Sequence, residues 1–221
     1  MQESKTRDKV LKKIRQAMIR KQPVPASPDP DVDSDIYVRT DETPSALFMR
    51  TFTLAGGTLI TCGTELDFLE QLTDIAGKKR WTNILCFEEK AKALLDSCEF
   101  PYAGKEEEFT RPAVAITLCE SLVARTGSVM LSSKQTSGRR LPVFPDAHLV
   151  LGYTSQIVPD IKDALQALRT KYGPRIPSMI TLATGPSRTA DIEKILVKGA
   201  HGPKEIYVFL VDDTLQSKRS G

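Results

Sequence analysis

The chain has 221 residues, of which 40% are hydrophobic and 27% are charged, and its formal net charge is +3. This near balance of 31 basic and 28 acidic residues argues against nucleic-acid binding, which needs Lys and Arg concentrated on one surface. No apolar run approaches the ~18 residues that a membrane-spanning helix needs, and the first residues are too polar for a signal peptide. We therefore expect a cytoplasmic protein without a membrane span.

The amino-terminal segment is predicted to form a helix followed by an extended linker. The apolar residues Val10, Leu11, Ile14, Ala17 and Met18 recur with helical spacing. The segment that follows has four prolines and four aspartates before Tyr37, a composition typical of an extended linker. We therefore predict a helix and linker over residues 1–42 and one α/β domain over residues 43–221. Whether the helix docks on its own domain or on a partner is left open.

From residue 43 onward, short apolar runs alternate with amphipathic segments. Thr43 and Pro44 mark the start of a helix that should end at Gly56 and Gly57. Strands are predicted at residues 58–62, 83–87, 113–117, 127–132, 147–151, 178–183 and 206–211. Further helices are predicted at residues 64–76, 88–96, 118–125 and 160–171. Because the last two strands are continuously apolar, as in strands buried on both faces, we expect an α/β fold with a mainly parallel sheet flanked by helices.

The polar loop TGPSRTADIE, residues 184–193, directly follows the predicted strand 178–183. In open α/β sheets, ligands bind outside the carboxyl ends of the strands. The loop offers hydroxyl groups and a guanidinium, and Ser187 or Thr189 could cap a short helix whose N–H groups face an anion. The alternative is an ordinary helix start with Arg188 in a structural salt bridge. The predicted ligand-binding residues here are Gly185, Ser187, Arg188, Thr189 and Asp191.

A second basic loop contains Arg139 and Arg140 after the segment KQTS. These guanidinium groups could bind a phosphate or a carboxylate, although an exposed hairpin-like loop is also consistent with the composition. Asp146 and His148 are two positions apart, so in a strand their side chains would point the same way. They could form a carboxylate–imidazole pair at a ligand site, or His148 could be a core histidine bonded to a neighbour.

Two further residues are candidates for catalysis. His201 lies in the segment GAHGP, and a histidine is the usual acid–base group at neutral pH. Glu120 opens the predicted helix 118–125, where it could serve as a nucleophile or general base or simply favour the helix dipole. The four cysteines are scattered, without C-x-x-C spacing and without a histidine at ligand spacing, so we expect neither a bound metal nor another cofactor.

Three segments together resemble the LUD-domain family: ITLCESLVARTGSVMLSS, GRRLPVFPDAHLVLGYTSQIVPDI and TGPSRTADIEKILVKGAHGPKEIYVFLVDD. The resemblance is strongest over the carboxyl-terminal half, and TGPSRTADIE followed by GAHGP at this spacing is its most specific part. It implies a fold similar to the NagB/RpiA/CoA-transferase group. The matching positions are Glu120, Gly127, Pro145, His148, Gly185, Pro186, Ser187, Arg188, Thr189, Asp191, His201 and Gly202.

The resemblance also implies a role in the oxidation of L-lactate to pyruvate, together with iron–sulfur partner proteins that carry the electrons. We therefore predict a non-redox component of such a system that binds a small anionic ligand or a partner protein. Whether it is an enzyme is left open. The alternative function is a stand-alone enzyme acting on a phosphosugar or an acyl-CoA, with Glu120 as nucleophile or base and Arg188 as an anion clamp.

Overall fold

The computed structural model describes residues 8–13, 15–16, 41–105, 113–190, 196–198 and 202–214, of which residues 189–190 and 196–198 are described by backbone alone. The chain divides into two units, Met1–Asp41 and Glu42–Gly221. In the first unit, residues 8–13 and 15–16 are helical, within the helix predicted from the apolar spacing. The predicted linker lies outside the described residues. Of the described helices, none is long and apolar enough to cross a membrane.

A five-stranded parallel sheet forms the centre of the second unit, in the order β1-β11-β6-β3-β2. Its two longest strands, β6 and β11, are buried almost throughout, because helices or strands cover both faces of the sheet. The apolar runs in the sequence thus mark these strands correctly, and the expected α/β fold with a parallel sheet is confirmed. In sheet order, the strands span Thr58–Cys62, Glu205–Val211, Ala147–Tyr153, Val114–Leu118 and Ile84–Cys86.

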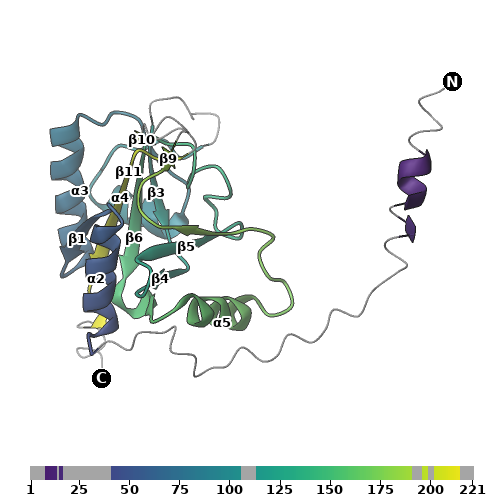
Figure 1. The fold of residues 1–221 in the computed structure, drawn as a ribbon. Coiled ribbons are helices and arrows are strands. Elements are labelled where there is room, and N and C mark those ends of the chain that lie inside the picture. The colour runs from purple at the N-terminus through teal and green to yellow at the C-terminus, as the bar shows by residue number, and fades with distance from the viewer. Residues whose placement is uncertain are drawn as a thin grey trace. The chain divides into compact units, whose positions relative to one another are not determined.

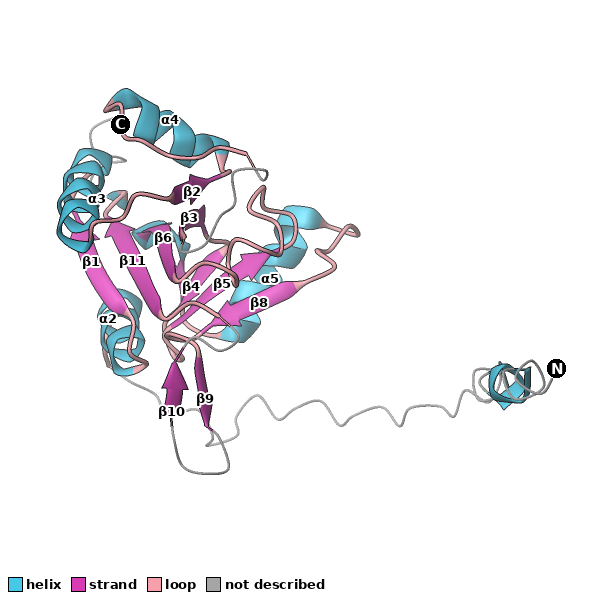
Figure 2. Ribbon diagram, turned by 90° about the horizontal axis from the view of Figure 1, so that it is seen from above, coloured by secondary structure: helices cyan, strands magenta, loops and turns pink. Residues whose placement is uncertain are grey.

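Helices α3 (Glu65–Lys79) and α4 (Glu89–Ser97) cover one face of this sheet (Figure 2). Thr64 starts α3 with a reciprocal capping box, in which its side chain and that of Asp67 each bond the other's backbone N–H. The apolar stripe of α3 then packs on β11, where the rings of Phe68 and Phe209 meet edge to face at 5.2 Å.

The opposite face is covered by α2 (Pro44–Leu54) and by a second, four-stranded sheet in the order β7-β4-β5-β8 (Figure 1). Phe48 and Phe52 of α2 are fully buried in this layer. Helix α5 (Ile161–Tyr172) packs on the far side of the second sheet through Ala164 and Leu168. In sheet order, the strands span Ile157–Val158, Ser121–Val123, Ser128–Ser132 and Ile180–Ala183.

Two elements of the second sheet differ from the sequence prediction. Residues 118–125 were expected to be a helix but contain β4, which pairs antiparallel with β5 and parallel with β7. The predicted strand 178–183 exists as β8, yet it is the edge of the second sheet rather than a strand of the parallel one, and its Leu182 is 37% exposed. A short apolar run can be satisfied by either kind of sheet, because its burial depends on partners far away in sequence.

The loop after β8 also departs from expectation. Residues Arg188–Ala190 form β9, which pairs antiparallel with β10 (Leu196–Lys198). The helix expected to begin after Ser187 or Thr189 is therefore replaced by a strand at these positions. Gly185 still provides the turn that the sequence predicts, with a φ of 76°, a conformation that favours glycine.

Candidate functional site

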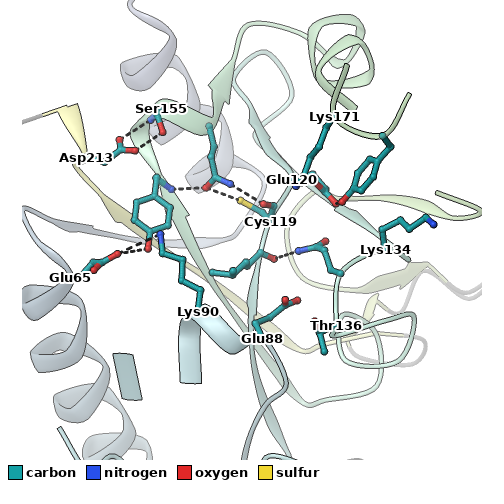
Figure 3. Close-up of a pocket in the computed structure, with 15 residues that line it drawn as sticks. Glu65, Glu88, Lys90, Cys119, Glu120, Lys134, Thr136, Ser155, Lys171 and Asp213 are labelled. Atoms are coloured by element: carbon teal, nitrogen blue, oxygen red, sulfur yellow. Dashed lines mark hydrogen bonds and ion pairs between the residues drawn. The ribbon is translucent and has the colours of Figure 1, made fainter. Parts of the chain in front are cut away.

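A cavity of about 610 Å³ lies at the carboxyl edge of the parallel sheet (Figure 3). Its walls come from the segments that follow the strands, because parallel strands all end at the same edge. Each of the five strands contributes a polar or charged residue shortly after its end. In sheet order these are Glu65, Asp213, Ser155, Glu120 and Glu88.

Glu120 occupies one wall of the cavity, and its side chain is only 1% exposed. Its carboxylate accepts hydrogen bonds from the Lys171 ammonium at 2.7 Å, the Ser132 hydroxyl at 2.6 Å and the Tyr172 hydroxyl at 2.8 Å. Burial alone would raise the pKa of Glu120, but these three bonds more than offset it, so the pKa lies below its usual value. Glu120 is thus a charged carboxylate, and both of its oxygens accept hydrogen bonds.

The opposite wall is formed by Tyr153, Glu65 and Lys90. The Tyr153 hydroxyl donates to Glu65 at 2.6 Å, and the Lys90 ammonium lies 3.9 Å from the centre of the Tyr153 ring. Lys90 also pairs with Glu65 at 3.6 Å. Burial, and then the bond to Glu65, raises the pKa of Tyr153. This hydroxyl therefore stays protonated and acts as a donor to Glu65.

The Gln156 amide also lines the cavity. It donates to the Cys119 carbonyl and accepts from the Tyr153 backbone N–H, each at 2.9 Å. Burial raises the pKa of the Cys119 thiol to about 12. The thiol therefore stays protonated at neutral pH, and Cys119 lines the cavity without being a nucleophile. Nearby, Asp213 accepts hydrogen bonds from the backbone N–H and the hydroxyl of Ser155.

Glu88 projects into the cavity from the turn between β2 and α4 (Figure 3). It is 6% exposed, and its Oε1 accepts from both the backbone N–H and the hydroxyl of Ser137. These bonds join the end of β2 to the loop that follows β5. Sequence reasoning missed Glu88, together with Glu65, Tyr153 and Asp213. The available signal was the repeated appearance of acidic residues just after apolar strands.

The loop after β5 lines two adjacent cavities. Lys134 and Thr136 line the large one, and in the part of the chain that the structure describes neither side chain has a hydrogen-bond or ion-pair partner. The predicted residues Arg139 and Arg140 line a smaller cavity of about 140 Å³, which shares Thr136 with the large one. Arg139 donates to the Ser178 hydroxyl at 2.8 Å, so it is tied to the segment before β8.

His148 does not line the large cavity or the smaller cavity beside Arg139. It is fully buried on β6, where its Nε2 lies 2.8 Å from the Thr117 hydroxyl. Its Nδ1 has no partner among the described residues, and Asp146 instead pairs with Lys204 at 2.9 Å, so the carboxylate–imidazole pair does not form. Burial lowers the pKa of His148 to about 4. Of the two possibilities that the sequence left open, the core histidine is the one observed.

Ser187 and Arg188 lie at the opposite, amino-terminal edge of the parallel sheet. The Ser187 N–H donates to Pro203, just before β11, and Arg188 donates to Ala55, just before β1. Asp213, at the other end of β11, lines the large cavity. A seven-residue strand separates its ends by roughly 20 Å. The structure therefore does not bring Arg188 together with Glu120.

Three predicted site residues lie wholly or partly outside the described residues. Asp191 and His201 are not described, and Thr189 is described by its backbone alone. Gly185 is described, and a side chain there would meet the Ala55 carbonyl oxygen at 2.2 Å, so this position serves close backbone packing. Among the described residues, no group of three or more His, Cys, Asp or Glu is arranged to hold a metal ion.

Comparison with known proteins identifies the family. A model of the LUD domain matches residues 4–211. The chain is 38% identical over 117 residues to lactate utilization protein C of Bacillus subtilis, covering 50% of this chain and 49% of that protein. It is 35% identical over 102 residues to the uncharacterised protein YkgG of Escherichia coli, covering 45% and 44%. The chain thus spans about half the length of the curated relatives it matches.

A solved structure supports the fold independently. The crystal structure of a DUF162 family protein from Deinococcus radiodurans matches with a TM-score of 0.57 and 18% identity, covering 77% of this chain and 99% of that one. At this identity the likeness concerns the fold alone, and the expected likeness to the NagB/RpiA/CoA-transferase group stays a prediction. Because the family model covers nearly the whole chain, the protein belongs to the LUD domain family.

Proposed function

We propose that this protein is a non-redox component of a cytoplasmic L-lactate oxidation system and works there with iron–sulfur partner proteins. The observation that carries the proposal is its similarity to lactate utilization protein C over about half of the chain. Fold alone does not define a reaction, so the roles of particular residues are argued from the site.

The large cavity is the proposed binding site for a small organic anion. It lies at the carboxyl edge of the sheet, where α/β proteins bind their ligands, and its volume of about 610 Å³ is within the usual range for ligand pockets. Lys134 is the cation proposed to attract the ligand, since the other two lysines of the cavity, Lys90 and Lys171, are paired with carboxylates. Thr136 adds an unbonded hydroxyl beside it.

Glu120 is proposed to build this site rather than to attack the ligand. A nucleophilic or basic carboxylate needs an oxygen free to approach the reacting atom. Both oxygens of Glu120 accept hydrogen bonds, one of them from an ammonium group. These contacts lower its pKa and its basicity. The geometry therefore favours a binding component over a stand-alone phosphosugar or acyl-CoA enzyme with Glu120 as its nucleophile.

The Ser187–Arg188 segment is proposed to dock a partner protein. Arg188 is exposed and lies at the edge of the sheet away from the cavity, and arginine is enriched at protein interfaces. The two proposed activities, ligand binding and docking, would then use opposite edges of the same sheet.

Deletion and complementation in the source organism test the function. A strain lacking the gene should grow poorly on L-lactate and normally on other carbon sources, and the wild-type gene should restore growth. A gene carrying Lys134→Ala should restore growth less well, whereas Lys162→Ala, which changes an exposed lysine of α5 outside the cavity, should restore it fully. Normal growth of the deletion strain on L-lactate would contradict the proposal.

A further inference from the structure

One carboxylate oxygen of Glu88 has no partner among the residues that the structure describes. Its side chain is largely buried, with the residue 6% exposed. Oε1 accepts two hydrogen bonds from Ser137, but Oε2 accepts none from the described residues and no lysine or arginine among them pairs with it. Figure 3 shows the carboxylate directed into the large cavity. Glu120 and Asp213 differ from Glu88 because both of their carboxylate oxygens accept hydrogen bonds, and Glu65 differs because it is paired with Lys90.

The other acidic residues of the cavity have partners within the protein, although both partners of Glu65 contact its Oε1. Glu120 has three donors, Glu65 has the Tyr153 hydroxyl and Lys90, and Asp213 has the donors of Thr154 and Ser155. A carboxylate has room for about four hydrogen bonds, and Oε2 of Glu88 is not one of the buried unpartnered atoms of the described residues, so it is open to the solvent in the cavity. This oxygen of Glu88 is therefore free to accept a further hydrogen bond within the cavity.

We propose that Oε2 of Glu88 accepts a hydrogen bond from a hydroxyl group of the ligand, while Lys134 at the rim attracts the anionic group of the same molecule. The ligand is then a hydroxylated organic anion. This inference rests on the proposed function, because it takes the cavity as the binding site, and it deepens that function by naming the ligand class and the residue that selects it.

The charges around the cavity support a hydroxylated ligand over a bare anion. Four carboxylates and three ammonium groups line the cavity, and two of the ammonium groups are already paired inside it. An anion without donor groups could bind Lys134 and the Thr136 hydroxyl but would face the unpaired oxygen of Glu88. A hydroxyl group turns that repulsion into a charge-assisted hydrogen bond, which is stronger than a neutral one.

Two matched pairs of compounds test this selectivity by titration calorimetry: L-lactate against propionate, and D-gluconate against hexanoate. Each pair shares a carboxylate and a chain length but differs in hydroxyl groups. The wild-type protein should bind the hydroxylated member of at least one pair about tenfold more tightly, the value expected for a hydrogen bond to a charged group. Lys134→Ala should weaken both members of that pair by a similar factor, because both carry the carboxylate.

Glu88→Gln should abolish the preference for the hydroxylated member. The amide oxygen of Gln would meet the two Ser137 donors, which leaves an NH2 group facing the cavity in place of an acceptor. Ser137→Ala is the control, since it removes the hydroxyl bond to Oε1 and leaves Oε2 in place, so the preference should persist. The inference is overturned if the wild type shows no hydroxyl preference in either pair, or if Glu88→Gln retains it.

The outcome can be separated from that of the proposed function. A deletion strain that grows poorly on L-lactate, combined with a Glu88→Gln protein that keeps the hydroxyl preference, would overturn the inference and leave the proposed function standing. A deletion strain that grows normally on L-lactate, combined with a hydroxyl preference that depends on Glu88, would do the reverse.

Discussion

The Glu120 carboxylate and the Lys171 ammonium lie 2.7 Å apart although 51 positions separate them in the chain. The pair joins the start of β4 to the end of α5 and closes one wall of the cavity. Glu120 is buried while Lys171 remains largely exposed, so the two residues contribute unequally to the free energy of unfolding. Removing the lysine leaves two hydroxyl donors in place, whereas removing the glutamate charge weakens all three bonds at once.

We expect Glu120→Gln to lower the free energy of unfolding by about 1–3 kcal/mol at neutral pH, because each of its three donors loses a charged acceptor that is itself buried. Glu70→Gln, at an exposed position of α3, is the control and should change it little. Urea unfolding of the three proteins measures the difference. Equal stabilities of wild type and Glu120→Gln would show that the wall does not depend on this charge.

The contribution of Glu120 should disappear in acid. Its folded-state pKa lies below the ordinary 4.5, so its stabilisation is present above that pH and is lost as the pH falls through the folded-state pKa. The stability gap between wild type and Glu120→Gln should therefore narrow only below about pH 4.5. A gap that already closes at pH 6 would contradict this assignment.

His148 should produce a separate pH dependence at higher pH. Its pKa falls from 6.5 to about 4 on burial, so the folded protein binds fewer protons than the unfolded chain in this window. Stability is then complete above pH 6.5 and decreases toward pH 4, by on the order of 3 kcal/mol. His148→Gln should flatten the curve of unfolding free energy against pH between these values. Parallel curves for the two proteins would argue against a neutral buried histidine.

Gly127→Ala should destabilise the fold by more than about 2 kcal/mol. Gly127 has a φ of 61°, and a Cβ there would lie 2.3 Å from the Phe52 backbone nitrogen. Gly138→Ala separates the two causes, since its φ is 62° but nothing lies within 4 Å of an added Cβ. Gly138→Ala should lower the free energy of unfolding by about 1 kcal/mol, through backbone strain alone. Similar urea midpoints for the two variants would contradict the steric part of this prediction.

Arg188→Ala should leave ligand affinity in the cavity unchanged and reduce partner binding, because Arg188 lies at the other edge of the sheet. Tagged variants purified from lactate-grown cells and analysed by mass spectrometry measure the retained partners. Arg175→Ala, in an exposed loop, is the matched control. Full retention of partners by Arg188→Ala would argue against docking at this segment.

The parallel sheet could be predicted because its strands are mostly apolar, as in residues 206–211 and in residues 147–151, where His148 is the one polar position. Residues 118–125 could not, since Leu118, Leu122 and Val123 fit a helical as well as an extended pattern, and only pairing with distant β5 and β7 decides. The residues after Ser187 could not be predicted for the same reason, since β9 forms by pairing with β10 where a helix was expected.

The residues that line the large cavity could be anticipated only in part, and their roles stay predictions. Glu120 was found through its motif, and the structure places it in the large cavity. His148 belongs to the same motif pattern but is a core residue. Glu88 and Glu65 belong to no motif, because a site assembled from five separate loops leaves no local pattern. Only the shared position of these residues after strand ends connects them.

The parallel sheet also separates the large cavity from the Ser187–Arg188 segment. The loops after the strands surround the cavity, while the turns before the strands hold Ser187 and Arg188. The three central strands between these edges, β11, β6 and β3, are paired on both sides, so we expect a substitution at one edge to leave the backbone of the other edge unchanged. Within this architecture, the proposed ligand site and the proposed docking segment can change independently of each other.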